Sequence, residues 1–130
     1  MVITIEDLHR RFAEYNRLYF RGKLSTPTIV IGKWSYGGIY GSYRHDKKGG
    51  PLISIRDTRS LRWTEEKLRN TLVHEMLHQY MDRGWFLDMD SSLHLLCWQT
   101  LRLWLNLRYG LHIHTWGEGR EHKSSKKKRG

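Results

Sequence analysis

The segment Thr71–Tyr80 constrains the fold more than any other part of the chain. Its sequence is TLVHEMLHQY, and Glu75 is its only charged residue. The apolar residues around it predict a buried helical turn in which His74 and His78, four residues apart, share one face. Two imidazoles and a carboxylate in such a turn need partners, because unpaired buried polar groups are costly. The fold must therefore enclose this helix and provide something that binds these side chains.

The same residues form the HExxH pattern. Two histidines one turn apart can ligate one cation, and Glu75 lies one step round the helix, near a metal-bound water. Zinc lowers the pKa of such a water to about 7, so the carboxylate can take its proton. We therefore predict that His74 and His78 bind Zn²⁺ and that Glu75 is the general base. The alternative is a helix with two incidental surface histidines.

A catalytic zinc usually has a third protein ligand and an open fourth position. The continuation HExxHxxGxxH fails, because Met81 and Gly84 stand where it requires Gly and His. We predict His94 instead, from the first turn of a third helix that folds back on the second. On that helix His94 shares an apolar face with Cys97, Trp98, Leu101 and Leu105. It is expected to point inward, although a core histidine bonded to the backbone has the same pattern.

Other side chains compete for a place in the site. Asp88 and Asp90 precede the third helix, where aspartates more often shape a loop or cap a helix. His112 and His114 form an HxH pair, which near a chain end is more often solvated. Asp82 lies one turn past the HExxH motif, where it either supports a ligand or simply solvates the helix end.

The chain is predicted to contain three helices and a small three-stranded sheet. Helical spacing predicts a first helix from an N-cap at Thr4 to Phe20, ended by Gly22. β-branched runs between turn residues predict hairpin-connected strands at Thr28–Gly32, Gly38–Tyr43 and Leu52–Arg56. The resulting fold class is α+β.

Two further helices are expected after the strands. The second runs from an N-cap at Thr64 to about Arg83 and contains the HExxH motif. The third begins at a cap on Ser91 or Ser92 and runs to about Arg108, where Gly110 stops it.

Composition limits the setting of the protein. The 130 residues suit one domain, and Cys97 is the only cysteine, so no intrachain disulfide can form. A single cysteine fits a reducing compartment. Charged residues interrupt the N-terminus too early for a secretory signal, and no apolar run reaches the ~20 residues of a membrane span. We expect a cytoplasmic protein without a membrane partner, and association with a nucleoid or nucleus is compatible with this.

The charge balance indicates polyanionic partners. Lys and Arg exceed Asp and Glu by 23 to 13, which gives a net charge of +10 and favours nucleic acid. We expect residues 1–112 to form the domain and residues 113–130 to form a basic, disordered tail. Non-specific DNA contacts are predicted in this tail at Lys123, Lys126, Lys127, Lys128 and Arg129. The alternative is a tail that only improves solubility.

Over residues 4–110 the sequence resembles the SprT-like, or Spartan-type, metalloprotease domain. The end of the first predicted helix, from Asn16 through Tyr19-Phe20-Arg21-Gly22-Lys23-Leu24, is similar to the N-terminal signature of that family. The glycine- and tyrosine-containing strand pair (Gly38, Tyr40, Gly41), Ile53-Ser54-Ile55 and the segment Thr71–His78 continue the similarity. The family's third ligand lies in a His-Gly-x-x-Phe context, which matches His94–Trp98 except that Leu95 replaces the glycine.

The resemblance implies a zincin-like α+β fold, a zinc-dependent endopeptidase and a role near DNA. Eukaryotic members of the family degrade proteins crosslinked to DNA, and many carry a zinc ribbon with four cysteines. With Cys97 alone, this sequence is not expected to contain that ribbon. Any DNA contact is therefore expected from the basic surface, the aromatic residues and the tail.

Three hypotheses follow for function. The first is a zinc metalloendopeptidase that acts on proteins associated with DNA, with the substrate held along an edge strand. The second is a zinc-stabilised nucleic-acid-binding module without turnover, and the third is an incomplete protease that serves as a scaffold. Structural zinc sites are closed and four-coordinate. Only three good ligands are visible here and Glu75 occupies the base position, so we favour the peptidase.

Overall fold

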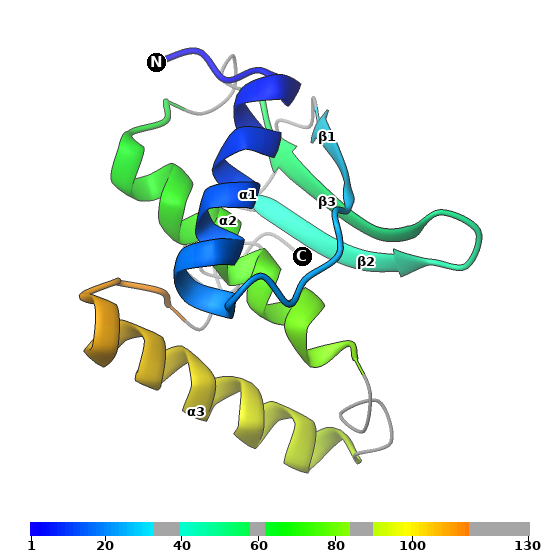
Figure 1. Cartoon of the computed structure of the whole chain (residues 1–130), viewed down its shortest axis with the longest axis vertical. Coiled ribbons are helices and arrows are strands. Elements are labelled where there is room, and N and C mark those ends of the chain that lie inside the picture. The colour runs from blue at the N-terminus through cyan, green and yellow to red at the C-terminus, as the bar shows by residue number, and fades with distance from the viewer. Residues whose placement is uncertain (33–39, 58–61, 84–89, 115–130) are drawn as a thin grey trace, which may run out of the picture.

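Three helices and a three-stranded sheet make up the described part of the chain, as Figure 1 shows. The structure is a computed structural model that describes residues 1–32, 40–57, 62–83 and 90–114. Along the chain the elements are α1 (Ile5–Phe20), β1 (Thr28–Gly32), β2 (Gly41–Asp46), β3 (Gly50–Arg56), α2 (Glu65–Met81) and α3 (Ser91–Tyr109). The predicted α+β class and the order of the elements are confirmed.

Side-chain caps fix the starts of the helices. The hydroxyl Oγ1 of Thr4 accepts a hydrogen bond from the Asp7 amide at 3.0 Å, and Thr64 accepts one from the Lys67 amide at 3.1 Å. Both N-caps agree with the sequence prediction. The N-cap of α3 was predicted at Ser91 or Ser92, and this was wrong. The cap is Asp90, whose carboxylate accepts from the Leu93 amide at 2.8 Å, because both serines already lie inside the helix.

The helix ends differ slightly from the predictions. Helix α1 ends in a left-handed turn that already starts at Arg21 (φ 55°) and continues at Gly22 (φ 71°). Helix α2 stops at Met81 rather than Arg83, with Asp82 as its C-cap. Helix α3 ends at Tyr109 with the predicted stop Gly110 as its C-cap, and the φ of 69° there is one that glycine adopts without strain.

The sheet has the strand order β1-β3-β2. Strands β2 and β3 form the expected antiparallel hairpin, but β1 pairs in parallel with β3, which places Ile29 beside Ile53. The prediction that hairpins connect all three strands was therefore wrong for β1. Strand β3 takes the centre because it is the most buried strand, with Ile53 and Ile55 fully enclosed. Strand β2 runs from Gly41 to Asp46, and the predicted start at Gly38 lies outside the described residues.

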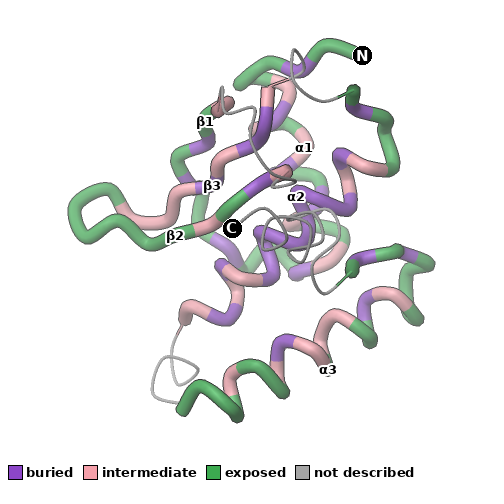
Figure 2. Tube along the Cα trace, turned by 180° about the vertical axis from the view of Figure 1, so that it is seen from behind, coloured by how far each residue is buried: buried purple, intermediate pink, exposed green. Residues whose placement is uncertain are grey.

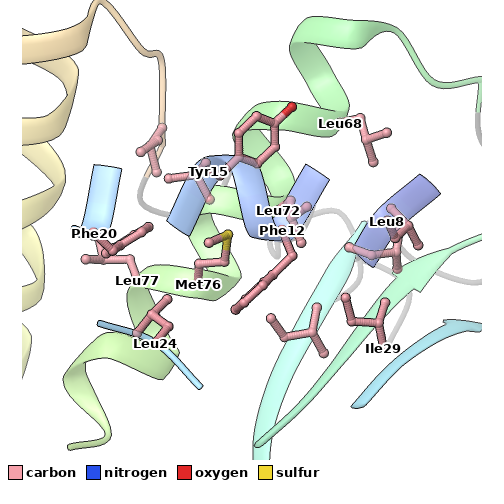
Figure 3. Packing of buried hydrophobic residues seen from close by; sticks show 14 of the residues in the cluster. Leu8, Phe12, Tyr15, Phe20, Leu24, Ile29, Leu68, Leu72, Met76 and Leu77 are labelled. Atoms are coloured by element: carbon pink, nitrogen blue, oxygen red, sulfur yellow. The ribbon is translucent and has the colours of Figure 1, made fainter. Parts of the chain in front are cut away.

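Helix α2 lies at the centre of the molecule. It contacts α1, the strands β2 and β3, and α3, whereas α3 lies on the far side of α2 from the sheet (Figure 1). Figure 3 shows Leu8 and Phe12 of α1 facing Leu72 and Met76 of α2 in the core. In Figure 2, α2 is mostly buried and α3 is mostly exposed or half-buried. The HExxH helix is therefore enclosed, as predicted.

The chain after α3 folds back along that helix. Leu111 and Ile113 are buried. The Ile113 amide donates to Asn106 Oδ1 at 2.9 Å, and its carbonyl accepts from Asn106 and Arg102. The packed part of the chain thus includes Ile113.

Residues 115–130 lie outside the described residues, so the predicted DNA contacts at Lys123, Lys126, Lys127, Lys128 and Arg129 remain predictions. No helix within the described ranges is long and apolar enough to cross a membrane.

Candidate metal centre

Helix α2 brings His74 and His78 together. Their positions four residues apart place both imidazoles on one face, with ring centroids 5.1 Å apart. Two imidazoles that share a tetrahedral zinc at about 2.1 Å have ring centres about 5 Å apart. His74 is 4% exposed and His78 is half-buried, so the pair is sheltered and still reachable from one side. The observed arrangement of the two side chains fits a shared zinc ion.

Trp98 of α3 encloses the histidine pair. Its ring is stacked on His78 with centroids 4.9 Å apart and an interplanar angle of 18°, and it meets His74 edge-on at 5.0 Å. The sequence placed Trp98 on the inner face of its helix but suggested no contact with the motif. Its spacing of four residues from His94 was the available signal. This indole fixes the orientation of both imidazoles by packing.

His94 lies in the first turn of α3 and is half-buried. It is one helical turn before Trp98 and so shares the face of α3 that is turned toward the histidine pair. Within the described residues, no three His, Cys, Asp or Glu side chains stand close enough together to hold a metal ion. The structure therefore assembles the pair on α2, and His94 as third ligand remains a prediction.

Strand β2 runs directly over Glu75. A Cβ atom at Gly41 would lie 3.0 Å from Thr71 Cγ2, 3.2 Å from the Ser54 carbonyl oxygen and 3.4 Å from Glu75 Cγ. Glu75 is itself 3% exposed. Only glycine permits so close an approach, because any side chain would have to displace Thr71 or the backbone. The sheet thereby forms one wall of the site beside the carboxylate.

Asp82 connects the end of α2 to the same strand. The Tyr43 hydroxyl donates to Asp82 Oδ2 at 2.7 Å. Burial, and then the hydrogen bond to this carboxylate, raise the pKa of Tyr43 above its usual value. Asp82 therefore joins β2 to the end of α2, and its suggested role in supporting a metal ligand stays a prediction. Asp88, another competing carboxylate, lies outside the described residues, and Asp90 caps α3.

His112 and His114 are exposed near the other end of α2. They line a polar cavity of about 450 Å³ together with residues of the first two turns of α2, Thr64, Glu66, Lys67 and Asn70. Asn70 is one turn before His74 on the same helical face. In the described part of the chain, these residues do not form a metal cluster.

Comparison with known proteins identifies the family of the chain. A search of curated proteins finds no match to the chain. The family model described as "SprT-like family" matches residues 8–115. This match spans α1, the sheet, the HExxH helix and α3. Because it covers most of the sequence, the chain belongs to the SprT-like family.

Proposed function

We propose that this protein is a zinc-dependent metallopeptidase that hydrolyses peptide bonds. In this proposal His74, His78 and His94 hold the metal and Glu75 is the general base. The observation that carries it is the pair of imidazoles 5.1 Å apart on the helix that also presents the enclosed Glu75. Membership of the SprT-like family supports a metallopeptidase-type domain.

The three protein ligands would leave an open position for chemistry. Zinc bound there would supply a Lewis acid that polarises a carbonyl group and makes water a better nucleophile. Glu75 would accept a proton from the attacking water and then deliver it to the departing amine. The low exposure of the carboxylate keeps it aimed in one direction, because Gly41 and Thr71 close in beside it.

Strand β2 suggests how a peptide is held. Within the described residues β2 pairs only with β3, so it is an edge strand, and Gly41 places it beside Glu75. An extended peptide that adds to this edge would receive main-chain hydrogen bonds. Its carbonyl groups would then pass close to the carboxylate. Because these contacts involve the backbone, we expect broad sequence preference.

We further propose that the substrates are proteins associated with DNA. The net charge of +10 supports this location, since it attracts polyanions. The tail residues Lys123, Lys126, Lys127, Lys128 and Arg129 would contribute phosphate contacts that weaken as salt rises.

Metal analysis combined with a cleavage assay tests the proposal. The purified protein should contain stoichiometric zinc and cleave casein. A chelator should abolish cleavage, added zinc should restore it, and single-stranded DNA should stimulate it at low salt. Zinc with no cleavage, and a loss of thermal stability on chelation, would favour the structural-zinc module instead. Metal-free protein with full thermal stability would contradict both.

A further inference from the structure

A second cavity opens between the end of α1, the end of α2 and the second half of α3. Its volume is about 430 Å³. Leu77, Leu101 and Leu105 contribute apolar walls, and Tyr19, Trp104 and Tyr109 contribute aromatic rings. Trp98 and the histidine pair do not line it. We call this cavity the α1–α3 groove, and it is large enough for several side chains of a ligand.

The apolar surface continues beyond the groove along α3. Trp104 is 49% exposed, and the neighbouring Leu103 and Leu107 are 51% and 87% exposed. Single exposed leucines are ordinary on protein surfaces. A groove that runs into adjoining exposed apolar side chains is characteristic of a docking surface.

The groove has a cationic rim. Arg21 and Lys23 line it directly. The Arg83 guanidinium lies 4.5 Å from the centroid of the lining ring of Tyr80, and Arg108 lies 5.0 Å from that of Tyr109. Stacking holds these two guanidinium groups in place beside the apolar floor.

The rim has no counter-charge of its own. No Asp or Glu lines the groove in the described part of the chain. Arg83 Nη1 donates a hydrogen bond to the Lys23 carbonyl oxygen at 3.1 Å, and none of the four cations forms a salt bridge with another described residue. Four cations around an apolar groove therefore favour a ligand that brings carboxylates.

We propose that the α1–α3 groove binds an acidic amphipathic segment of a partner protein, most simply a helix. Its apolar side chains enter the groove and cover Trp104, while flanking carboxylates pair with Arg21, Lys23, Arg83 and Arg108. A second copy of this chain is a poorer match, because it brings a net charge of +10 and cations of its own. Nucleic acid would satisfy the cations and rings but would leave the leucine walls without an apolar partner.

Fluorescence anisotropy with defined probes tests this proposal without relying on catalysis. The main probe is a labelled peptide of about four helical turns, with leucines at helical spacing and glutamates on the flanks. A second peptide has the same composition in an order that scatters the leucines, and a third has lysine in place of glutamate. Single-stranded oligo-dT is the nucleic-acid probe. Mass spectrometry verifies that the peptides remain intact.

The acidic amphipathic peptide should bind at least about tenfold more tightly than the scrambled or basic peptide. Trp104→Ala, and the double change Arg21→Glu with Lys23→Glu, should each weaken that binding about tenfold. Lys47→Glu with Lys48→Glu, on the exposed β2–β3 turn, is the matched charge control and should change it little. Thermal melts verify that each variant is folded.

Three results would overturn the proposal. Equal binding of the scrambled peptide would mean that charge alone attracts the probe. An equal loss in the Lys47/Lys48 variant would remove the groove as the location. Oligo-dT binding that requires Trp104, Arg21 and Lys23 would assign the groove to nucleic acid instead.

Discussion

Helices α2 and α3 reverse the usual relation between hydrophobicity and burial. Helix α2 buries 11 of its 17 residues, and the buried set includes polar side chains such as Asn70, His74 and Glu75. Helix α3 buries only Trp98 and Leu105 among its 19 residues, although seven of those residues are leucines. Burying polar groups costs free energy, and exposing leucines forgoes stabilisation. The polar groups inside α2 are where we propose chemistry, and the leucines outside α3 are where we propose binding.

The largest effect should come from the carboxylate in α2. We predict that Glu75→Gln lowers casein cleavage by about 10²–10⁴-fold, because the amide cannot accept the proton from water. Zinc content and the circular dichroism spectrum should not change. Glu66→Gln, in the exposed first turn of the same helix, should retain activity. Full turnover by Glu75→Gln would remove the assigned base.

Leucine substitutions in the two helices should also differ strongly in how much they lower the free energy of unfolding. Leu72→Ala in α2 should cost about 2–5 kcal/mol, because Leu72 is fully enclosed and the change leaves a cavity. Leu107→Ala in α3, where the residue is 87% exposed, should change stability by less than about 0.5 kcal/mol. Urea unfolding measures both values. Similar losses in the two variants would mean that α3 is covered in solution.

The contribution of α3 to metal binding is tested at His94. We predict that His94→Ala lowers zinc affinity by at least about 10–100-fold, the range seen even for the loss of outer partners. Competition with a chromophoric chelator gives the affinity. His112→Ala is the matched control and should bind zinc like the wild type. If His112→Ala gives the loss and His94→Ala does not, the third ligand has been assigned to the wrong segment.

There is no room for an added carbon atom at Gly41, where β2 packs against α2. Gly41→Ala should cost about 1–3 kcal/mol through overpacking, and it should also lower cleavage by displacing Glu75. Ser42→Ala, at the neighbouring exposed position, should have little effect on either quantity. Thermal unfolding and the casein assay together provide the check. An unchanged Gly41→Ala protein would mean that β2 lies further from the carboxylate.

The smallest effect concerns the ion pair that joins α2 to α1. Arg11 donates two hydrogen bonds to Glu65, and this contact lowers the pKa of the carboxyl. The stabilisation is present above the unfolded-state pKa of about 4.3 and is lost as pH falls through the lowered folded-state value. It should remain below about 1 kcal/mol, because the Glu65 side chain is 73% exposed.

We expect the stabilisation by this ion pair to decrease as the pH falls. Unfolding experiments on the wild type and Glu65→Gln, from neutral pH to about pH 3, test this direction. The difference in the free energy of unfolding between the two proteins should decrease as the pH is lowered. A difference that grows toward acid would contradict the assigned pair.

Local signals in the sequence predicted what depends on neighbouring residues. The caps at Thr4 and Thr64, the stop at Gly110 and the HExxH pair are all determined within a few residues. Strand order was not predictable, because β1 pairs with β3 through backbone hydrogen bonds between residues that lie far apart in the sequence.

Two contacts in the site were not predicted, because they also depend on residues far apart in the sequence. Trp98 meets the histidines, and Gly41 meets Glu75, only after separate elements pack together. At the start of α3 the sequence offered both the serines and the aspartates as caps, since Asp and Ser are equally good candidates and the backbone decides which one lies outside the helix.

Trp98 links the packing of α3 on α2 to the shielding of the histidine pair. It is one of only two buried residues of α3, and it is also the ring that contacts both imidazoles. Any motion that lifts α3 from α2 uncovers the histidines and carries His94 away at the same moment. By thermodynamic reciprocity, a cation gripped by both helices would hold α3 closed. Amide hydrogen exchange along α3 should therefore slow as the protein is loaded with metal.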